Sequence, residues 1–492
     1  METKTNKIAI PQKGLEAAEI LSQLEAMKSH DVPWDSGKVL AYVYEPKKET
    51  ENLAKDAYRM YLIENGLDPT AFPSLLKLEN DLIGMAKDLL GGGKDEVVGN
   101  MTSGGTESII LAVKTARDYF KAKRPEIKEP ELIIAETAHA AFHKAGHYLG
   151  VKVVMVPVNT TTFKVEPKLV EAAITENTIL IVGSAPSYAH GVVDPIEELA
   201  KIAKSRDILC HVDACVGGFY LPFAHKAGYD VTPFDFSVDG VTSISADFHK
   251  YGYAIKGASC ILQKNRDLRR YQIFACSSWS GYTIINPTVL SSKTGGPLAG
   301  AWATLNHIGQ EGYIEIVKGC QEATQLCREG IAEIPELEIL GDPDINLVAI
   351  ASTDPKINIF AISDWMAKRG WHIQVQLAST CSREALHLSI NRANIAQIPE
   401  LLEQFKLAIA ELKEKESPEM AFDPAMLAPM FDNMNAETFD NLAGMLGLGG
   451  GGEGAGLPDD LEMINNILNK LPAAQRNVLL TEFMNKLFTV NS

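Results

Sequence analysis

The sequence predicts an α/β protein with a large domain built on a mainly parallel sheet and a small α+β domain toward the C-terminus. From about residue 97 to 262, short apolar runs alternate with amphipathic helical stretches, which is typical of a parallel sheet covered on both faces. Beyond about residue 335, short strands with two helical stretches follow. A chain of 492 residues with 46% hydrophobic and 22% charged residues is long enough for two or three packed units.

The N-terminal segment is predicted to be helical, because LAKDAYRMYLIENG and LLKLENDLIGMAKDLLG are amphipathic at helical spacing. The expected strands of the large domain are ELIIAE, VKVVMVPV, TILIVGSA, ILCHVDA, FDFSVDG and ASCILQ, and its helices include PKLVEAAITEN and IEELAKIAKS. The expected strands of the small domain are ELEIL, NLVAIAS, WHIQVQL and ALHLSIN, with helices at IFAISDWMAKRG and IPELLEQFKLAIAELKEKE.

The chain after about residue 416 has a different composition. It holds seven of the 14 methionines, a glycine-rich run at 447–456 and the helical pattern LEMINNILNK. Methionine at helical spacing is more often plain packing than a partner-binding surface, and the glycine run is expected to be a flexible linker. We therefore expect an N-terminal helical segment, a large α/β domain, a small α+β domain and a Met-rich helical tail, at residues 1–96, 97–334, 335–415 and 416–492.

Charge, hydropathy and cysteine pattern exclude several classes of protein. The net charge is -17 at pH 7 and no block of lysine or arginine occurs, which argues against a nucleic-acid partner. No apolar run is long enough to cross a bilayer and the start lacks a secretory signal, so we expect a cytoplasmic protein without a transmembrane segment. The seven cysteines form no CxxC pair, which argues against a disulfide framework and a zinc site; no metal is expected. Cys215 is expected to be an ordinary buried cysteine.

A small-residue stretch, TSGGTES at 102–108, stands directly before the helical pattern ESIILAVKTARDYF. Small residues let the backbone approach a ligand, and the free N–H groups of a first helical turn favour an anion, so a phosphate fits at Gly104, Gly105 and Thr106. Taken alone, the stretch is also an ordinary turn and helix cap. It lacks the GxGxxG spacing and the P-loop lysine, so neither NAD nor ATP is indicated.

Three further residues carry chemistry: Asp213 in HVDA, His139 in TAHAAF and Lys250 in DFHKYG. Taken singly, each has an ordinary structural interpretation, as a capping or ion-paired acid, a structural histidine and a surface lysine. With the phosphate loop they form the set that pyridoxal 5'-phosphate needs, namely an acid for the ring nitrogen, a histidine near the ring and a lysine able to form a Schiff base. The expected cofactor is therefore pyridoxal phosphate, held by Lys250.

Five stretches carry a family resemblance: TSGGTESI, AHAAFHKA, SYAHGVVDPIEELAKIA, HVDACVGGF and GVTSISADFHKYGYAIKG. They resemble sphingosine-1-phosphate lyases, which belong to the group II pyridoxal-phosphate-dependent decarboxylase family, and the resemblance runs from about residue 36 to 412. It implies the type I fold of pyridoxal-phosphate-dependent transferases, with Lys250 as the Schiff-base lysine, Asp213 at the pyridine nitrogen and His139 on the ring face. The residues implied around the cofactor phosphate are Gly105, Thr106 and His249.

The resemblance also implies a homodimer with the active site at the interface, in which the KTGG stretch at 293–296, with Gly295 and Gly296, reaches the partner's cofactor. The positions matching the lyases around the substrate's phosphate or reacting hydroxyl are Tyr44, Tyr188 and Lys256. Lys256, six residues after Lys250, offers a point charge to a phosphate, and taken alone it fits a turn lysine equally well.

Two departures from the lyase pattern bear on the substrate. The stretch GLDPTAFP has Asp68 where these lyases usually carry a histidine that meets the substrate phosphate, and a carboxylate facing a phosphate is repulsive. The same DPxxF pattern occurs in amino-acid decarboxylases of the group, so Asp68 favours a decarboxylase. In the second departure, Lys293 and Thr294 stand in place of an Arg-Pro pair.

Three functions are therefore weighed, two of them enzymatic with a small-molecule substrate. The favoured one is retro-aldol cleavage of a phosphorylated amino alcohol, such as sphingosine 1-phosphate, to an aldehyde and phosphoethanolamine, with Tyr188 or Lys250 near the hydroxyl proton. The alternative is an amino-acid decarboxylase of the L-tyrosine or L-aspartate type, for which Arg383 and Arg392 are candidate carboxylate ligands. The third function, a scaffold that keeps the fold without catalytic activity while its Met-rich tail binds a partner, is disfavoured. An inactive site has no need for Lys250, Asp213 and His139 together.

Overall fold

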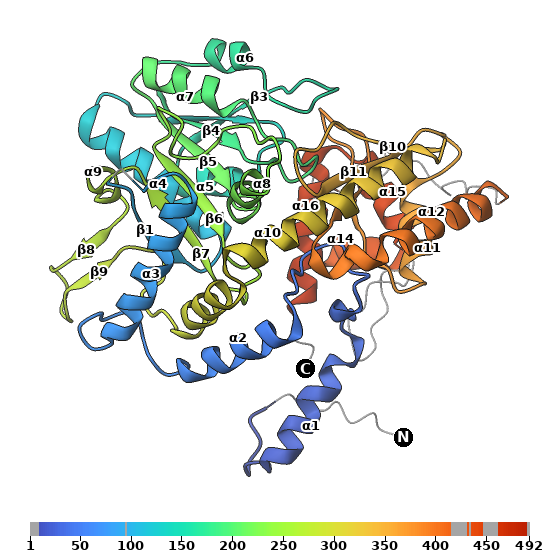
Figure 1. The fold of residues 1–492 in the computed structure, drawn as a ribbon, viewed down its shortest axis with the longest axis horizontal. Coiled ribbons are helices and arrows are strands. Elements are labelled where there is room, and N and C mark those ends of the chain that lie inside the picture. Colours follow the sequence, from blue (N-terminus) through green and yellow to red (C-terminus); the bar gives the residue numbers. More distant parts are fainter. Residues whose placement is uncertain (1–8, 94–95, 415–430, 432–433, 446–460, 490–492) are drawn as a thin grey trace.

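A seven-stranded sheet forms the centre of the computed structural model, which describes residues 9–93, 96–414, 431, 434–445 and 461–489 (Figure 1). Its strand order is β1-β7-β6-β5-β4-β2-β3, and β7 alone runs against its neighbours. The strands are β1 (Val98–Thr102), β2 (Glu131–Ala135), β3 (Lys152–Val156), β4 (Thr178–Ser184), β5 (Leu209–Ala214), β6 (Ser243–Asp247) and β7 (Ser259–Gln263). This mainly parallel sheet confirms the predicted fold class.

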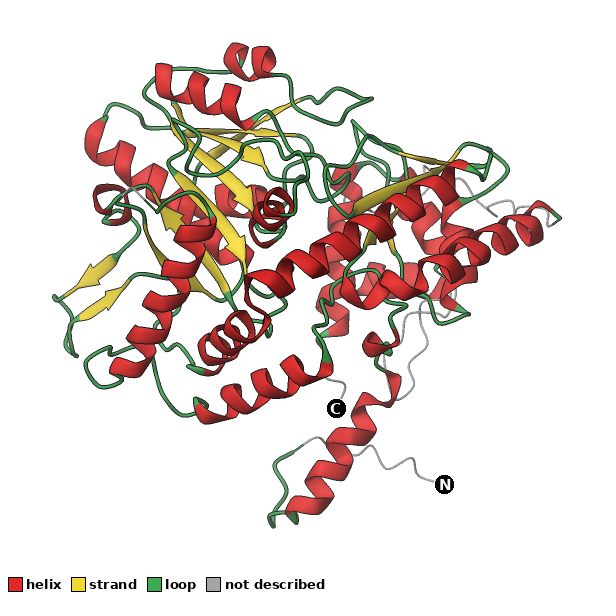
Figure 2. Cartoon of the chain, in the orientation of Figure 1, coloured by secondary structure: helices red, strands yellow, loops and turns green. Residues whose placement is uncertain are grey.

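Helices cover both faces of this sheet (Figure 2). Leu132 and Ile134 of β2 pack with α4 and α5 on one face, whereas Ile133 belongs to the core on the other face, to which α7, α8 and α10 contribute. Because both faces are buried, the central strands are apolar along their whole length. The covering helices are α4 (Gly105–Lys123), α5 (Ala141–Leu149), α6 (Pro167–Ala172), α7 (Ile196–Ser205), α8 (Leu221–Lys226) and α9 (Arg266–Arg269).

The carboxyl ends of β1, β2, β4, β5 and β6 meet at one edge of the sheet. Each is followed within a few residues by a small-residue or polar stretch, where open α/β sheets bind their ligands. The candidate site residues of the large domain lie in these stretches.

The segment FDFSVDG at 234–240, expected to be a strand, is a series of turns, which corrects that prediction. Asp235 Oδ1 accepts hydrogen bonds from the Ser237 N–H at 2.9 Å and hydroxyl at 2.6 Å, and this local turn competes with strand pairing. Phe234, Phe236 and Val238 are still buried, so the alternation of apolar residues reflects packing alone.

Strand β1 and a β8–β9 hairpin (Phe274–Cys276 and Ile284–Asn286) were not among the expected strands. The sequence of β1, VGNMT, has no continuous apolar run, and its glycine is needed because β7 lies close. A Cβ on Gly99 would lie 2.6 Å from the carbonyl oxygen of Ile261.

A long helix, α10 (Gly296–Ala332), connects the large sheet with the small C-terminal sheet and kinks at Gly309, where φ is 63°. The small sheet is antiparallel, in the order β10-β11-β13-β12, and helices α11 and α12 share its core. These elements are β10 (Leu337–Ile339), β11 (Leu347–Ser352), β12 (Gln374–Gln376), β13 (Ala385–Ser389), α11 (Ile359–Ala367) and α12 (Ile398–Lys413).

The N-terminal helices are α1 (Ala17–Met27), α2 (Lys48–Met60) and α3 (Pro73–Leu89), of which α2 and α3 pack against α10. The C-terminal helices are α14 (Ala436–Met445), α15 (Glu462–Lys470) and α16 (Ala473–Leu487). They share a small apolar cluster that includes Leu442, Ile467 and Leu471. The glycine-rich run at 447–456 lies outside the described residues. The four predicted domain ranges stay predictions.

No helix in the described part of the chain is both long and apolar enough to span a membrane. The predicted cytoplasmic location stays a prediction.

Candidate active site

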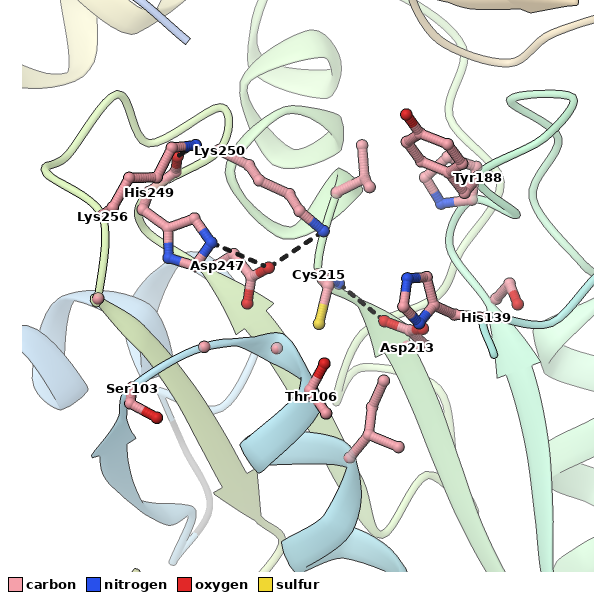
Figure 3. Close-up of a pocket in the computed structure, with 17 residues that line it drawn as sticks. Ser103, Thr106, His139, Tyr188, Asp213, Cys215, Asp247, His249, Lys250 and Lys256 are labelled. Carbon is pink, nitrogen blue, oxygen red and sulfur yellow. Dashed lines mark hydrogen bonds and ion pairs between the residues drawn. The ribbon is translucent and has the colours of Figure 1, made fainter. Parts of the chain in front are cut away.

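One pocket at the carboxyl edge of the large sheet brings together most of the residues singled out in the sequence (Figure 3). It encloses about 370 Å³, within the usual range for a small-molecule site. The predicted site residues that line it are Gly104, Gly105, Thr106, His139, Tyr188, Asp213, His249, Lys250 and Lys256.

Lys250 projects into this pocket from the turn after β6, and its Nζ lies 3.1 Å from Asp247 Oδ2 (Figure 3). Burial acts to lower the pKa of Lys250, but attraction to Asp247 and to the other acidic groups around it together outweighs burial, and the pKa is raised. Burial likewise acts to raise the pKa of Asp247, whereas Lys250 and His249 lower it, and the net shift is downward. His249 Nε2 lies 3.7 Å from the same carboxylate. Asp247 is therefore an ionised, buried anion that holds the lysine in place.

Asp213 lies at the end of β5 and is buried. Its Oδ1 accepts hydrogen bonds from the Cys215 N–H at 3.1 Å and from the Ser245 hydroxyl at 3.3 Å. The second carboxylate oxygen of Asp213 has no hydrogen bond to the described residues that line this pocket, so it is available to a ring nitrogen.

The N-terminus of α4 forms one wall of the pocket. The helix begins at Gly105, so its first N–H groups have no acceptor within the helix. A Cβ on Gly105 would lie 2.7 Å from Cys215 Sγ and 2.9 Å from Asp247 Oδ2, so only glycine lets the chain pass this close to the pocket floor. Glu107 accepts hydrogen bonds from the N–H and hydroxyl of Ser103, which fixes the loop that leads into the helix.

His139 follows β2 and lies beside Asp213 at the pocket wall (Figure 3). Its Nδ1 accepts a hydrogen bond from the Ala141 N–H at 3.1 Å, which sets the orientation of the ring. Tyr188 follows β4 and stacks on His387 of β13, with ring centroids 4.2 Å apart. The pocket therefore has an aromatic side as well as a charged side.

Lys256 lies at the pocket rim, where its Nζ donates to the carbonyl oxygens of Tyr42 at 2.7 Å and His249 at 3.2 Å. It also lies 5.1 Å from the centroid of the Tyr44 ring, which brings Tyr44 beside the pocket although Tyr44 does not line it. The residue is exposed, yet protein atoms crowd its ammonium. The pKa of Lys256 is lowered to about 8, mainly because these atoms desolvate its ammonium and secondly because the Lys250 charge repels it.

Several predicted site residues lie outside the pocket that contains Lys250. Asp68 turns back on its own loop, where its Oδ1 accepts hydrogen bonds from the N–H groups of Thr70 and Ala71. Gly295 and Gly296 lie at the start of α10 against the side chains of Tyr61 and Tyr58. Asp68 and Lys293 instead line a separate hollow, together with residues of the β8–β9 hairpin.

The two arginines considered as carboxylate ligands are engaged elsewhere. Arg383 pairs with Glu338 and donates to the carbonyl oxygen of Ser352. Arg392 donates to the carbonyl oxygens of Glu45 and Pro46. Neither lines the pocket that contains Lys250.

Asp247 is the main site residue that the sequence analysis missed. Its signal is its place at the last position of β6, three residues before Lys250, because a buried carboxylate there needs a cation within reach. Ser103, Cys215 and Gly257 also line the pocket. Burial raises the pKa of the Cys215 thiol, which disfavours a reactive thiolate.

The residues of the pocket fit pyridoxal phosphate. Lys250 would supply an amine for the aldehyde, Asp213 a carboxylate for the ring nitrogen, and the start of α4 a set of free N–H groups for the phosphate. Asp247 Oδ1 is buried without a hydrogen-bond partner among the described residues, so it can accept a hydrogen bond from a ligand or water.

Comparison with known proteins gives matches along most of the chain. The pyridoxal-dependent decarboxylase conserved domain matches residues 2–352, and a second family model for a C-terminal domain of pyridoxal-dependent enzymes, HTH_PLP, matches residues 419–486. A sphingosine-1-phosphate lyase of Oryza sativa is 41% identical over 84% of this chain and 76% of its own length. A Pyrococcus furiosus relative named "Probable L-aspartate decarboxylase" is 36% identical over 74% of this chain and 94% of its own length.

The solved structure of a Burkholderia pseudomallei sphingosine-1-phosphate lyase is 33% identical, covers 82% of this chain and 92% of that chain, and has a TM-score of 0.76. The fold and the pocket define an enzyme that works through pyridoxal phosphate. The chain belongs to the pyridoxal-dependent decarboxylase family, as a lyase that is similar over most of its length to sphingosine-1-phosphate lyases. The predicted family, type I fold and cofactor are thereby confirmed.

Proposed function

We propose that this enzyme splits a phosphorylated amino alcohol of the sphingosine-1-phosphate type into an aldehyde and phosphoethanolamine. The relatives at 41% and 33% identity are both sphingosine-1-phosphate lyases, which supports the proposal. The observation that carries it is Lys256, a cation at the rim of the Lys250 pocket that has no ion-paired carboxylate among the described residues.

A cation without a carboxylate partner suits a phosphate better than it suits a neutral substrate. The alternative, an amino-acid decarboxylase, needs a group that holds the substrate's carboxylate. Among the described residues that line the pocket, none is an arginine, and Arg383 and Arg392 are bound elsewhere. Lys256 can pair with either anion, so the similarity to sphingosine-1-phosphate lyases is what favours the phosphate ester over the amino acid.

Pyridoxal phosphate, when bound, supplies an electron sink joined to the carbon that bears the substrate's amine. Lys250 Nζ would hold the cofactor until that amine takes its place, and the lysine would leave as a neutral amine, which can take the proton from the substrate's hydroxyl oxygen. Tyr188 is not this base, because burial first and the neighbouring Tyr44 second raise the pKa of its phenol. Asp213 would provide a negative charge for the ring nitrogen, and His139 would cover the ring.

Purified holoprotein supplied with a sphingoid-base phosphate is expected to release a long-chain aldehyde and phosphoethanolamine. A panel of amino acids, including L-tyrosine and L-aspartate, is expected to yield no carbon dioxide. Both products are quantified under the same conditions, with boiled enzyme as the control. Carbon dioxide from an amino acid without aldehyde from the phosphate ester would overturn the proposal.

The Lys256→Met variant is expected to raise KM for the phosphorylated substrate by about 10- to 100-fold, which corresponds to one lost charge-assisted hydrogen bond. Because the pKa of Lys256 is about 8, its ammonium loses its proton as the pH rises through 8. KM of the wild-type enzyme should therefore rise above pH 8. Steady-state kinetics across this range measure it, and Lys256→Arg, which keeps its charge, is the control. A pH-independent KM would contradict the role of Lys256.

We also propose that the chain forms a homodimer, in which the Asp68 loop and the KTGG stretch approach the partner's pocket. Exposed apolar side chains gather on α2, α3 and the loop between them, on the β8–β9 hairpin and on the loop before α10, around the hollow that contains Asp68 and Lys293. They are Met60, Leu62, Ile63, Leu76, Trp279, Tyr282, Ile285, Val289 and Leu290. Exposed apolar patches of this kind mark protein interfaces.

Light scattering is expected to give twice the chain mass of 53.6 kDa. Ile63→Asp, at a side chain that is 89% exposed, should shift the protein toward the monomer, because a carboxylate is costly to bury at an apolar interface. The matched control is Tyr148→Asp on α5, at a position that is 64% exposed on another side of the large domain, which should leave the mass unchanged. A monomeric wild-type protein would contradict the dimer.

A further inference from the structure

A hydrogen bond links the pocket to the small sheet. The hydroxyl of Tyr188, which follows β4 of the large sheet, donates to Gln374 Oε1 at 2.6 Å. Gln374 is the first residue of β12 in the small sheet and does not line the pocket. The only proton of the phenol is therefore directed at the small sheet and away from the pocket.

The Ser389 hydroxyl lies within reach of the Tyr188 hydroxyl, but its one proton is directed at His387, which leaves the phenol oxygen free to accept. Burial lowers the pKa of His387, on which Tyr188 stacks, to about 4, so the imidazole is neutral and carries one proton. His387 Nδ1 lies 3.3 Å from the carbonyl oxygen of Ala189, which only accepts, so the proton is on Nδ1. His387 Nε2 then accepts from the Ser389 hydroxyl at 3.0 Å, and the Ser389 proton is engaged as well.

A tyrosine hydroxyl has one proton and two lone pairs, so a Tyr188 that donates to Gln374 can only accept a hydrogen bond from a substrate. A phosphate dianion offers acceptors alone, whereas the reacting hydroxyl of an amino alcohol offers a donor. We infer that Gln374 is a positioning residue that makes Tyr188 the acceptor for the substrate's reacting hydroxyl as the substrate binds, before the Lys250 amine takes that proton, and that it leaves the phosphate to Lys256. The inference rests on the proposed function, because it names the groups of that substrate.

The two orientations of the Gln374 side-chain amide have opposite consequences. If its NH₂ group faced Tyr188, the phenol would accept from Gln374 and donate into the pocket, where it would suit a phosphate. Gln374→Glu separates the two cases, because an ionised carboxylate accepts hydrogen bonds and cannot donate them. Gln374→Met keeps a similar length and removes both functions.

The experiment compares the affinity of the holoenzyme for two phosphorylated amines that differ only in the reacting hydroxyl. Each amine is titrated against the visible absorbance of bound pyridoxal phosphate, and the affinity ratio between the hydroxylated amine and its deoxy counterpart is recorded. Wild-type enzyme is expected to prefer the hydroxylated amine by about 10-fold. The ratio should fall to about 1 in Gln374→Met and stay within about threefold of the wild-type value in Gln374→Glu.

Gln376→Met is the matched control, because Gln376 lies two residues along β12 and donates to the carbonyl oxygen of Ala189 at 3.4 Å. Its affinity ratio should equal that of the wild type. A ratio of 1 in wild-type enzyme or in Gln374→Glu, or an undiminished ratio in Gln374→Met, would overturn the inference. Aldehyde release by the wild type tests the proposed function separately. If the enzyme prefers the hydroxylated amine but releases no aldehyde, the proposed function is wrong, whereas the inference about Gln374 and Tyr188 still holds.

Discussion

The Lys250→Ala variant is expected to lose at least about 10³-fold in kcat and to lose the visible absorbance of the lysine imine. Loss of a positioned acid-base group alone costs 10²- to 10⁴-fold, and this variant also loses the covalent attachment of the cofactor. The change should also lower the stability of the apoprotein by about 3 kcal/mol, because it leaves the buried Asp247 without its cation at 3.1 Å. Turnover assays, absorbance spectra and urea unfolding measure the three effects.

The Lys250→Arg variant is the control that separates catalysis from folding. Its guanidinium keeps a positive charge beside Asp247 but stays protonated at neutral pH, so it forms no imine. We therefore expect a protein of nearly wild-type stability that is as inactive as Lys250→Ala. If Lys250→Ala kept its imine absorbance or its turnover, another amine would have to be the attachment point, and the assignment of Lys250 would be wrong.

The sequence was sufficient to predict most strands of the large sheet and most of the site residues at its carboxyl edge. Apolar runs such as TILIVGSA and ILCHVDA leave no alternative to buried strands, and a parallel sheet brings the ends of its strands to one edge. Asp213 and Lys250 could therefore be placed close together before their distances were known. The spacing of small residues before α4 identified the third wall of the pocket in the same way.

What the sequence could not supply was the set of contacts between distant segments. Gln374 is 186 residues from Tyr188, and no periodicity relates the two positions. Asp68 matches a substrate-binding position of the lyases, yet in this chain its carboxylate caps its own loop. The turn at 234–240 was mistaken for a strand, because an Asx turn and a strand can bury the same alternate residues.

The Asp213→Asn variant is expected to lower kcat by about 10²- to 10³-fold, the cost of removing one electrostatic group from an active site. The amide is neutral, so it cannot hold a proton on the ring nitrogen, and the ring withdraws electrons less strongly. The fold should be preserved, because the side-chain oxygen of asparagine can still accept from the Cys215 N–H and the Ser245 hydroxyl.

The measurement for Asp213 is kcat at saturating pyridoxal phosphate, with the cofactor's affinity determined separately by absorbance titration. Asp213→Glu keeps the charge on a chain one methylene longer, so its loss in kcat should be smaller than that of Asp213→Asn. This ordering distinguishes charge from shape, because asparagine is the closer match in size. Equal losses in both variants would mean that Asp213 acts through its hydrogen bonds to the loop after β5. A wild-type kcat in Asp213→Asn would mean that Asp213 is not the partner of the ring nitrogen.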